Sequence, residues 1–146
     1  MRASIGRKLI HSLRLLKVFH WDVQSMLNSP QPQCYQLQIL LKQDARIEVG
    51  RLGVFDFPAG RYVYTGSAKK NIGARISRHL SLEKKLRWHI DYLLQHPATS
   101  IIVVELFTAT ECEVNKRTRG TSVAFRFGAS DCKAACGSHL KYRGSN

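Results

Sequence analysis

The pattern of hydrophobic and polar positions changes its period along the chain. From Cys34 to Leu41, hydrophobic residues at every second position alternate with mostly polar ones, which predicts a half-buried strand. Short extended segments follow at residues 47–49 and 54–57, and a turn at Pro58 leads into a further expected strand that includes Tyr62 and Tyr64. This part of the chain is therefore predicted to form hairpin-like β-structure.

Helical spacing replaces the alternation after residue 70. Ile72, Ile76 and Leu80 predict a helix that Asn71 can cap, with basic residues beside the apolar face. Leucine and isoleucine continue the same spacing over residues 82–96, so a second helix is expected there, ended by a proline.

The last third of the chain mixes both patterns. An apolar, β-branched run at residues 101–107 predicts a buried strand, and residues 110–117 predict a short helix with Thr110 as its cap. Residues 123–127 are expected to close the sheet, and the tail from residue 141 onwards is expected to fray.

The first 30 residues form a separate segment with apolar residues at helical spacing between Ile5 and Leu16 and five basic residues against one acid. A basic amphipathic helix is expected. It is interpreted as an accessory helix that docks on the domain or on a polyanion, as a transit-like leader, or as sequence upstream of the functional start. Pro30 marks a boundary, which divides the chain into this extension, a domain over residues 34–142 and a tail at residues 143–146.

Charge is the unusual feature of the composition. The 146 residues carry 23 Lys and Arg against 10 Asp and Glu, a formal net charge of +13, while 44% hydrophobic residues suffice for the core of one domain. Such an excess of base is typical of proteins that bind a polyanion.

Membranes and secretion are not expected. Basic residues and histidines interrupt the only apolar candidate near the start, so the sequence has no stretch of the roughly 20 apolar residues that a spanning helix needs and no secretory signal. A cytoplasmic, nucleoid-associated protein is expected, with cysteines that are reduced thiols or metal ligands.

The basic excess is concentrated between Asp56 and Asp91, where Glu83 is the one acid against eight basic residues. These are Arg61, Lys69, Lys70, Arg75, Arg78, Lys84, Lys85 and Arg87. Arg75 and His79, four residues apart, share one helical face. Nucleic-acid chemistry needs such a combination. Cations hold the phosphates, a guanidinium binds phosphate oxygens bidentately, and a polar group lies beside it. A solvated basic face that binds nucleic acid without cutting it is the simpler interpretation.

Several ordered motifs over residues 34–142 resemble one nuclease family. The segments Tyr64–Ala68 (YTGSA) and Gly73–His79 (GARISRH) resemble the core of the GIY-YIG nuclease superfamily, and Cys34-Tyr35 resembles a remnant of its first motif. The segments WHIDYL at 88–93, FGASDC at 127–132 and SHL at 138–140 resemble a poorly characterised branch of that superfamily, some members of which are fused to endonuclease III-type glycosylases.

The resemblance implies a small α/β domain with a central, mainly antiparallel sheet flanked by helices, and a reaction that uses one divalent metal, Mg²⁺ or Mn²⁺. It implies a catalytic group made of Tyr35, Tyr64, Arg75 and His79. Substrate-binding residues are expected beside this group, namely Gly66, Ser67, Lys69, Lys70, Arg78 and His89. The expected function is therefore metal-dependent DNA endonuclease activity, in repair or structure-directed cleavage. A binding module of the same fold without cutting is the alternative, and a ribosome- or RNA-associated basic protein is a third.

The metal ligand departs from the family pattern. The family's glutamate lies on the helix after the third strand, but this register carries Lys116 to Arg119. The candidate carboxylates are Glu111, Glu113, Asp91 and Asp131.

Two histidines and an aspartate have competing interpretations. Cys132, Cys136 and His139, with Cys112 or His89 as a fourth ligand, resemble a zinc site, but the missing Cys-x-x-Cys knuckle argues against zinc. His89 is either a hydrogen-bonded core histidine or a substrate contact that reaches toward the catalytic face. Asp91 is either a functional carboxylate or the partner of Arg87 in a surface ion pair, and the nearby Trp88 and Tyr92 are expected in the core.

Overall fold

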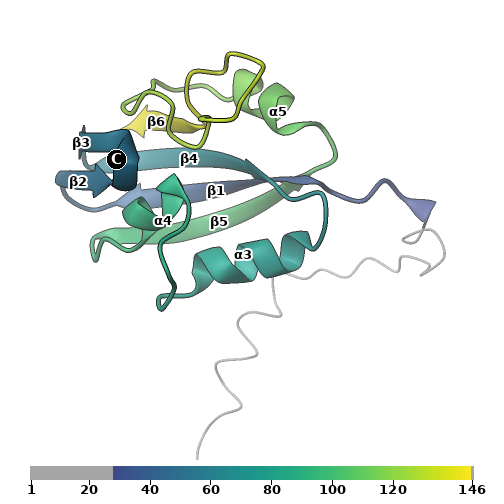
Figure 1. Cartoon of the computed structure of the whole chain (residues 1–146), viewed down its shortest axis with the longest axis horizontal. Coiled ribbons are helices and arrows are strands. Elements are labelled where there is room, and N and C mark those ends of the chain that lie inside the picture. Colours follow the sequence, from purple (N-terminus) through teal and green to yellow (C-terminus); the bar gives the residue numbers. More distant parts are fainter. Residues whose placement is uncertain (1–27, 146) are drawn as a thin grey trace, which may run out of the picture. The chain divides into compact units, whose positions relative to one another are not determined.

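The computed structural model describes residues 28–145 (Figure 1). The chain divides into two units, residues 1–30 and 31–146, and the fold belongs to the second unit. The basic amphipathic helix expected over residues 1–30 lies outside the described residues, except for its last three positions. Within the described range no helix combines the length and the apolar character needed to cross a membrane.

A four-stranded antiparallel sheet in the order β5-β1-β4-β6 forms the centre of the second unit. Its strands are β1 (Cys34–Leu41), β4 (Gly60–Ser67), β5 (Thr99–Phe107) and β6 (Leu140–Gly144). In the sequence, two further strands come between β1 and β4. They are β2 (Ala45–Val49) and β3 (Gly53–Phe57), which are joined by the 3-10 turn η1 (Gly50–Leu52) and form a separate two-stranded sheet. The flanking helices are α3 (Ile72–Leu80), α4 (His89–Leu94) and α5 (Glu111–Arg117). The predicted α/β class with a small antiparallel sheet between helices is confirmed.

The central strand β1 is buried on both faces. On one face Leu37 lies opposite Tyr64 of β4, and both belong to the hydrophobic core. On the other face the buried Gln36 side chain donates to the Thr65 hydroxyl (3.0 Å) and to the Thr118 hydroxyl (2.7 Å), so its polar atoms have partners beneath α5. The alternation in the sequence predicted a half-buried strand; β1 is more buried than this, because the face with the glutamines is covered at Gln36, whereas Gln38 and Leu40 are only partly buried.

The edge strand β5 corrects a second expectation. The apolar run at residues 101–107 predicted a buried strand, but β5 pairs with β1 alone and exposes Ile102, Val103 and Leu106 by 46–52%. Helix α3 runs along this edge of the sheet, whereas α5 lies on the side of β4 and β6 (Figure 1). Apolar side chains on an edge strand therefore mimicked the pattern of an interior one.

The second predicted helix is much shorter than its apolar spacing suggested. Residues 82–88 are not helical, and α4 begins only at His89. The Asp91 carboxylate accepts hydrogen bonds from the backbone N–H groups of Arg87 (2.8 Å) and Trp88 (2.9 Å) and so caps the helix at this point. Leu82, which seemed part of the apolar face, is 87% exposed.

The strand that closes the sheet lies later in the chain than predicted. Residues 123–127 form turns rather than a strand, and the sheet is closed instead by β6, in the segment that was expected to fray. Arg126 has a positive φ of 64°, which a strand does not tolerate. The buried Phe127 ring belongs to the core although its backbone is irregular, so its apolar character predicted burial but not conformation.

Candidate functional site

Two tyrosines and a histidine from three elements meet at one end of the sheet. Tyr35 lies on β1, Tyr64 on β4 and His79 on α3, and each is at most 8% exposed. The Tyr35 hydroxyl and His79 Nε2 form a hydrogen bond of 2.6 Å. The ring centroid of Tyr64 lies 6.5 Å from that of Tyr35 and 6.2 Å from that of His79. Three residues of the expected catalytic group are therefore neighbours.

Glycines make room for both tyrosine rings. Gly66 pairs with Tyr35 across the strands, and a Cβ at this position would lie 2.5 Å from the tyrosine ring. Gly128, with a φ of +65°, would place a Cβ 2.8 Å from the ring of Tyr64. Gly66 was expected to bind substrate, but the structure gives another reason for a glycine at this position: a larger residue would displace Tyr35.

Arg75, the fourth expected catalytic residue, lies beside this cluster. Its guanidinium is 4.2 Å from the ring centroid of Trp88, within cation–π range, and donates a hydrogen bond of 3.3 Å to the Ser67 carbonyl. Two contacts from different elements therefore fix the orientation of the guanidinium. Trp88 was expected in the core; it is partly buried and packs against the core, and its ring also contacts the Arg75 guanidinium, which the sequence did not predict.

Arg78 is engaged by Asp91 rather than free for substrate. Its guanidinium forms a two-pronged ion pair with the fully buried carboxylate (2.8 and 2.9 Å) and also donates to the Lys85 carbonyl (2.7 Å). Burial raises the pKa of Asp91, but hydrogen bonds from Arg78 and from two backbone N–H groups outweigh it and hold the pKa below its ordinary value. The expected surface pair with the Arg87 side chain was wrong, because Arg87 contributes only its backbone N–H. Asp91 is therefore a structural carboxylate.

Burial sets the protonation of the cluster. It raises the pKa of Tyr35 far above its ordinary value, although the nearby Arg75 opposes this, and it raises the pKa of Tyr64 as well. Burial, together with Lys84 and the neighbouring arginines, lowers the pKa of His79 to about 4 despite the opposing charge of Asp91. At neutral pH the cluster therefore holds two protonated hydroxyls and a neutral imidazole.

The neutral His79 predicts acid sensitivity. The pKa of His79 is near 6.5 in the unfolded chain and about 4 in the folded one. As the pH falls, the unfolded state therefore binds the proton first, and this favours unfolding. The contribution of His79 to stability is therefore complete above about pH 6.5 and is lost between pH 6.5 and 4. In urea titrations across this range, His79→Gln is expected to show a shallower fall of the unfolding free energy than the wild type. Equal slopes for the two proteins would contradict the assignment.

Among the candidate carboxylates, Glu111 faces the end of the sheet near the tyrosines. Its Oε2 accepts a hydrogen bond from the Ser67 hydroxyl (3.0 Å), and its Oε1 lies 3.0 Å from Nδ1 of His139. Its side chain is 25% exposed, and its charge contributes to the raised pKa of both Tyr35 and Tyr64. This carboxylate is therefore both accessible to solvent and close to the cluster.

The other two carboxylates have different surroundings. Glu113 caps its own helix: its carboxylate accepts from the Thr110 backbone N–H (3.0 Å) and hydroxyl (2.7 Å). Asp131 is exposed in the loop that precedes β6. The structure thus brings Glu111 to the sheet end and Asp131 to a cavity that Tyr64 also lines, whereas Glu113 stays at the start of its own helix.

Tyr64 and Glu111 line two separate surface cavities, and His79 lines a third, of about 230 Å³. One of about 290 Å³ is lined by Tyr64, Trp88, His89, Gly128 and Asp131, together with Arg87 and Ser130. Another of about 260 Å³ lies at the start of α5 and is lined in part by Ser67, Lys69 and Glu111. Tyr64 thus borders one cavity and Glu111 the other.

His89 lies in the wall of the first cavity. Its Nδ1 accepts a hydrogen bond from the Gly128 N–H (3.0 Å), and its ring centroid is 5.7 Å from that of Phe127. Burial, with the nearby Arg126, lowers its pKa. Both expectations for His89 therefore describe part of its position, since it is hydrogen-bonded on one side and borders the cavity that Tyr64 lines.

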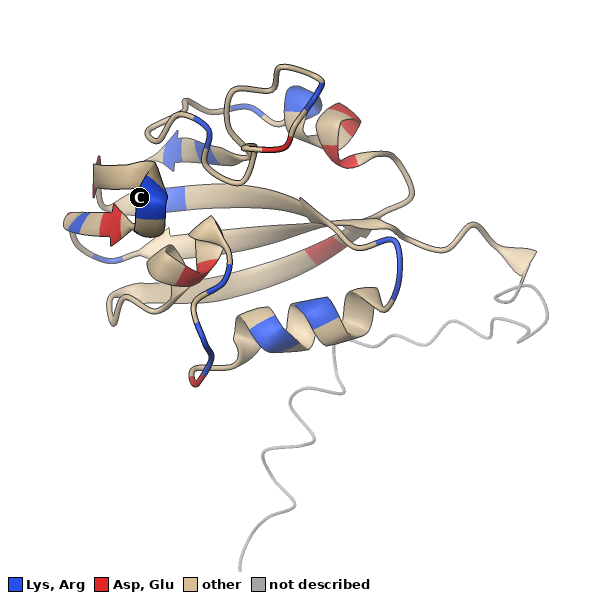
Figure 2. Ribbon diagram, viewed as in Figure 1, with Lys and Arg blue, Asp and Glu red and all other residues tan. Residues whose placement is uncertain are grey.

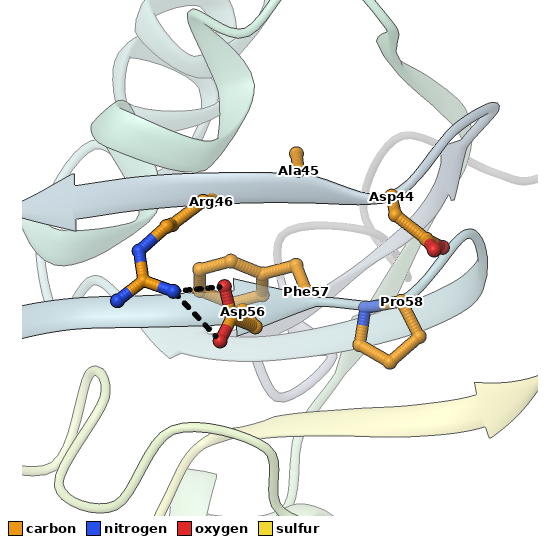
Figure 3. Close-up of a pocket in the computed structure, with 6 residues that line it drawn as sticks. All are labelled: Asp44, Ala45, Arg46, Asp56, Phe57 and Pro58. Atoms are coloured by element: carbon orange, nitrogen blue, oxygen red, sulfur yellow. Dashed lines mark hydrogen bonds and ion pairs between the residues drawn. The ribbon is translucent and has the colours of Figure 1, made fainter.

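A cavity larger than these lies elsewhere. Figure 3 shows the depression of about 400 Å³ along the β2–β3 hairpin, lined by Asp44, Arg46, Asp56, Phe57 and their neighbours. The ion pair drawn there, between Arg46 and Asp56, is 73–75% exposed. Since the hairpin leads into the end of β4 opposite Gly66, this cavity is separate from the tyrosine cluster.

Basic residues border the cluster on the side of α3. Figure 2 shows Lys and Arg along α3 and along the segments that precede and follow it. Lys69 and Lys70 are exposed between β4 and α3, and Lys85 and Arg87 are exposed in the segment before α4. Most of the basic residues concentrated in the sequence therefore lie on α3 or in the segments on either side of it, whereas Arg61 lies at the opposite end of β4.

Comparison with known proteins gives a family. The model described as "Domain of unknown function DUF123" matches residues 34–146, which include the whole four-stranded sheet and all of the clustered residues. No curated protein and no solved structure matches the chain.

Proposed function

The chain belongs to the DUF123 family, and we propose that it is a metal-dependent DNA endonuclease that hydrolyses phosphodiesters by GIY-YIG-type chemistry. The observation that carries the proposal is the convergence of Tyr35, Tyr64, His79 and Arg75 at one end of the sheet, beside the carboxylate of Glu111. The rings of Tyr35 and Tyr64 pack in the hydrophobic core, but core packing does not require two hydroxyls, an imidazole and a guanidinium from β1, β4 and α3 to meet at one place.

In this proposal the phosphate backbone of DNA binds beside α3. Exposed lysines on both sides of α3 attract the phosphates, a contribution that does not depend on sequence. Arg75 is held by the Ser67 carbonyl and the Trp88 ring, so its guanidinium is already oriented when a phosphate arrives. Such a preorganised cation stabilises the charge that develops on the phosphate in the transition state.

The tyrosines have distinct parts. Tyr64 borders a cavity open to solvent, where its protonated hydroxyl can orient a water molecule toward the phosphate. Tyr35 lies deeper, with its hydroxyl held by the neutral His79. A tyrosine whose pKa is raised in this way stays protonated at neutral pH and offers almost no phenolate to accept a proton, so we assign both hydroxyls to positioning rather than to proton removal.

Glu111 is the carboxylate that fits a hard divalent cation. Each of its oxygens accepts one hydrogen bond, which leaves a lone pair on each for a metal, and oxygen ligands from one or two carboxylates with substrate phosphates are typical of Mg²⁺. When bound, Mg²⁺ or Mn²⁺ would neutralise charge on the scissile phosphate and lower the pKa of a coordinated water. The Ser67 hydroxyl and the His139 ring keep the carboxylate in place.

The test is cleavage of supercoiled plasmid and branched DNA by the full chain at low salt, with Mg²⁺, with Mn²⁺ and with EDTA. Nicking is expected with either metal and not with EDTA. Glu111→Gln keeps the size of the side chain but loses the charge and one of the two acceptor oxygens, so it is expected to lower the rate by a factor of about 10² or more while DNA binding persists.

Arg46→Ala is the matched control, because it removes a basic residue from the exposed hairpin pair. It is expected to cut as the wild type does. If the wild type binds DNA with strong salt dependence but never cuts across these metals and substrates, the chain is a nucleic-acid-binding module and the nuclease proposal is wrong.

A further inference from the structure

Three thiols that the proposed reaction does not use lie together with the imidazole that holds Glu111, between α5 and the segment before β6. They are Cys112, Cys132, Cys136 and His139. One ligand atom from each, three sulfurs and a ring nitrogen, lies within 4.8 Å of all the others. Cys112 comes from α5, whereas the other three come from a loop 20 or more residues later in the chain.

The sulfur separation suits a shared metal ion. Cys112 Sγ and Cys132 Sγ are 3.6 Å apart. A disulfide needs about 2.05 Å between its sulfurs. Two thiolates on a tetrahedral zinc, with Zn–S bonds of about 2.3 Å, lie roughly 3.7 Å from each other. The observed distance agrees with the second arrangement.

His139 presents the correct nitrogen. Its Nδ1 is engaged by Glu111 at 3.0 Å, whereas its Nε2 is buried and has no hydrogen-bond partner among the described residues. A ligating histidine commonly donates its other N–H to a carboxylate, which fixes the tautomer and aims the free lone pair at the metal. An unpartnered buried nitrogen would otherwise be costly.

We propose that Cys112, Cys132, Cys136 and His139 form a closed, tetrahedral Cys₃His zinc site with a structural role. The soft sulfur ligands and the tetrahedral geometry select Zn²⁺ over Mg²⁺ or Ca²⁺. Zinc would be held by three thiolates and one neutral imidazole, so binding displaces whatever protons the three sulfurs and His139 Nε2 carry in the metal-free chain, and His139 keeps its Nδ1 proton, which it donates to Glu111. The site would tie α5 to the loop over residues 128–139, which is built of turns.

The spacing in the sequence argued against zinc because the loop lacks a Cys-x-x-Cys knuckle. Folding supplies the missing ligand from α5, since the helix places Cys112 against Cys132. The inference does not depend on the nuclease proposal: the site holds together α5 and the loop whether or not the protein cuts DNA.

Metal content of the purified full chain tests the site. Elemental analysis against protein concentration is expected to give one zinc per chain, retained through dialysis against EDTA at neutral pH. Cys132→Ser is expected to lose most of this zinc. The matched control is Cys34→Ser, which changes a buried strand cysteine outside the cluster and is expected to keep one zinc per chain.

Cobalt substitution keeps the proposal testable if Cys132→Ser does not fold. Wild-type protein loaded with Co²⁺ is expected to show strong thiolate-to-cobalt absorption in the near ultraviolet and the intense visible bands of a tetrahedral site. A weak octahedral cobalt spectrum would overturn the proposal. So would a Cys112–Cys132 disulfide in the freshly purified protein, an iron–sulfur absorption, or freshly purified, folded protein that contains no zinc and whose Cys112, Cys132 and Cys136 react with Ellman's reagent.

Discussion

Asp91→Ala is expected to destabilise the domain by about 3–5 kcal/mol, near the lower end because Arg78 keeps partial contact with solvent. The carboxylate is fully buried and accepts four hydrogen bonds, two from Arg78 and two from the backbone at the start of α4. Its removal leaves a guanidinium without its counter-charge and a helix without its cap. The free energy of unfolding in urea at pH 7 measures this loss.

Asp56→Ala is the matched control, because the ion pair of Asp56 with Arg46 is three-quarters exposed. Pairs of this kind contribute at most about 1 kcal/mol, so this variant is expected to unfold close to the wild type. A similar, small loss in both variants would show that Asp91 does not hold α3, α4 and the intervening segment together. A large loss in Asp91→Ala alone supports the structural assignment.

Local signals in the sequence predicted the elements that depend on local chemistry. Asn71 and Thr110 do cap the helices that follow them: the Asn71 side chain accepts from the Ala74 N–H, and Thr110 forms a capping box with Glu113. Such caps lie within four residues of their partners, so the sequence alone contains the whole interaction. For the same reason the turn at Pro58 and the strand after it were predicted at nearly the observed positions.

Interactions between distant segments were the ones that sequence patterns missed. Asp91 and Arg87 are four residues apart, a spacing that predicts a pair on one helix, yet the partner is Arg78, 13 residues away on α3. The ion pair with Arg78 and the cap both depend on where the chain turns between α3 and α4. Periodicity carries no information about that turn, so the helix was predicted to begin at residue 82, seven residues before its observed start at His89.

The carboxylate near the cluster illustrates the same limit. Alignment to the family pattern left four acids as candidates, because their order along the chain does not say which faces the sheet end. Glu111 is distinguished by Ser67 at the end of β4 and by His139 just before β6. Those contacts exist only once both strands pair, and β6 lies in a segment whose composition predicted fraying.

Arg75→Ala is expected to lower metal-dependent DNA cleavage by a factor of about 10²–10³ while changing DNA affinity little, if the chain is the proposed nuclease. One cation among the many around α3 contributes a small share of phosphate binding, but a guanidinium oriented by the Ser67 carbonyl and Trp88 contributes mainly where charge develops. Single-turnover nicking rates at saturating protein measure the chemical step apart from binding.

Arg75→Lys separates charge from shape. Lysine keeps the positive charge but loses the planar, two-pronged contact with phosphate, so the rate is expected to recover only in part. The two variants also need the stability of the wild type, since Arg75 packs on Trp88; urea unfolding supplies that check. If cleavage persists undiminished in Arg75→Ala, the activity belongs to other residues or to a contaminant. If rate and affinity fall together, Arg75 anchors the substrate and does not stabilise the transition state.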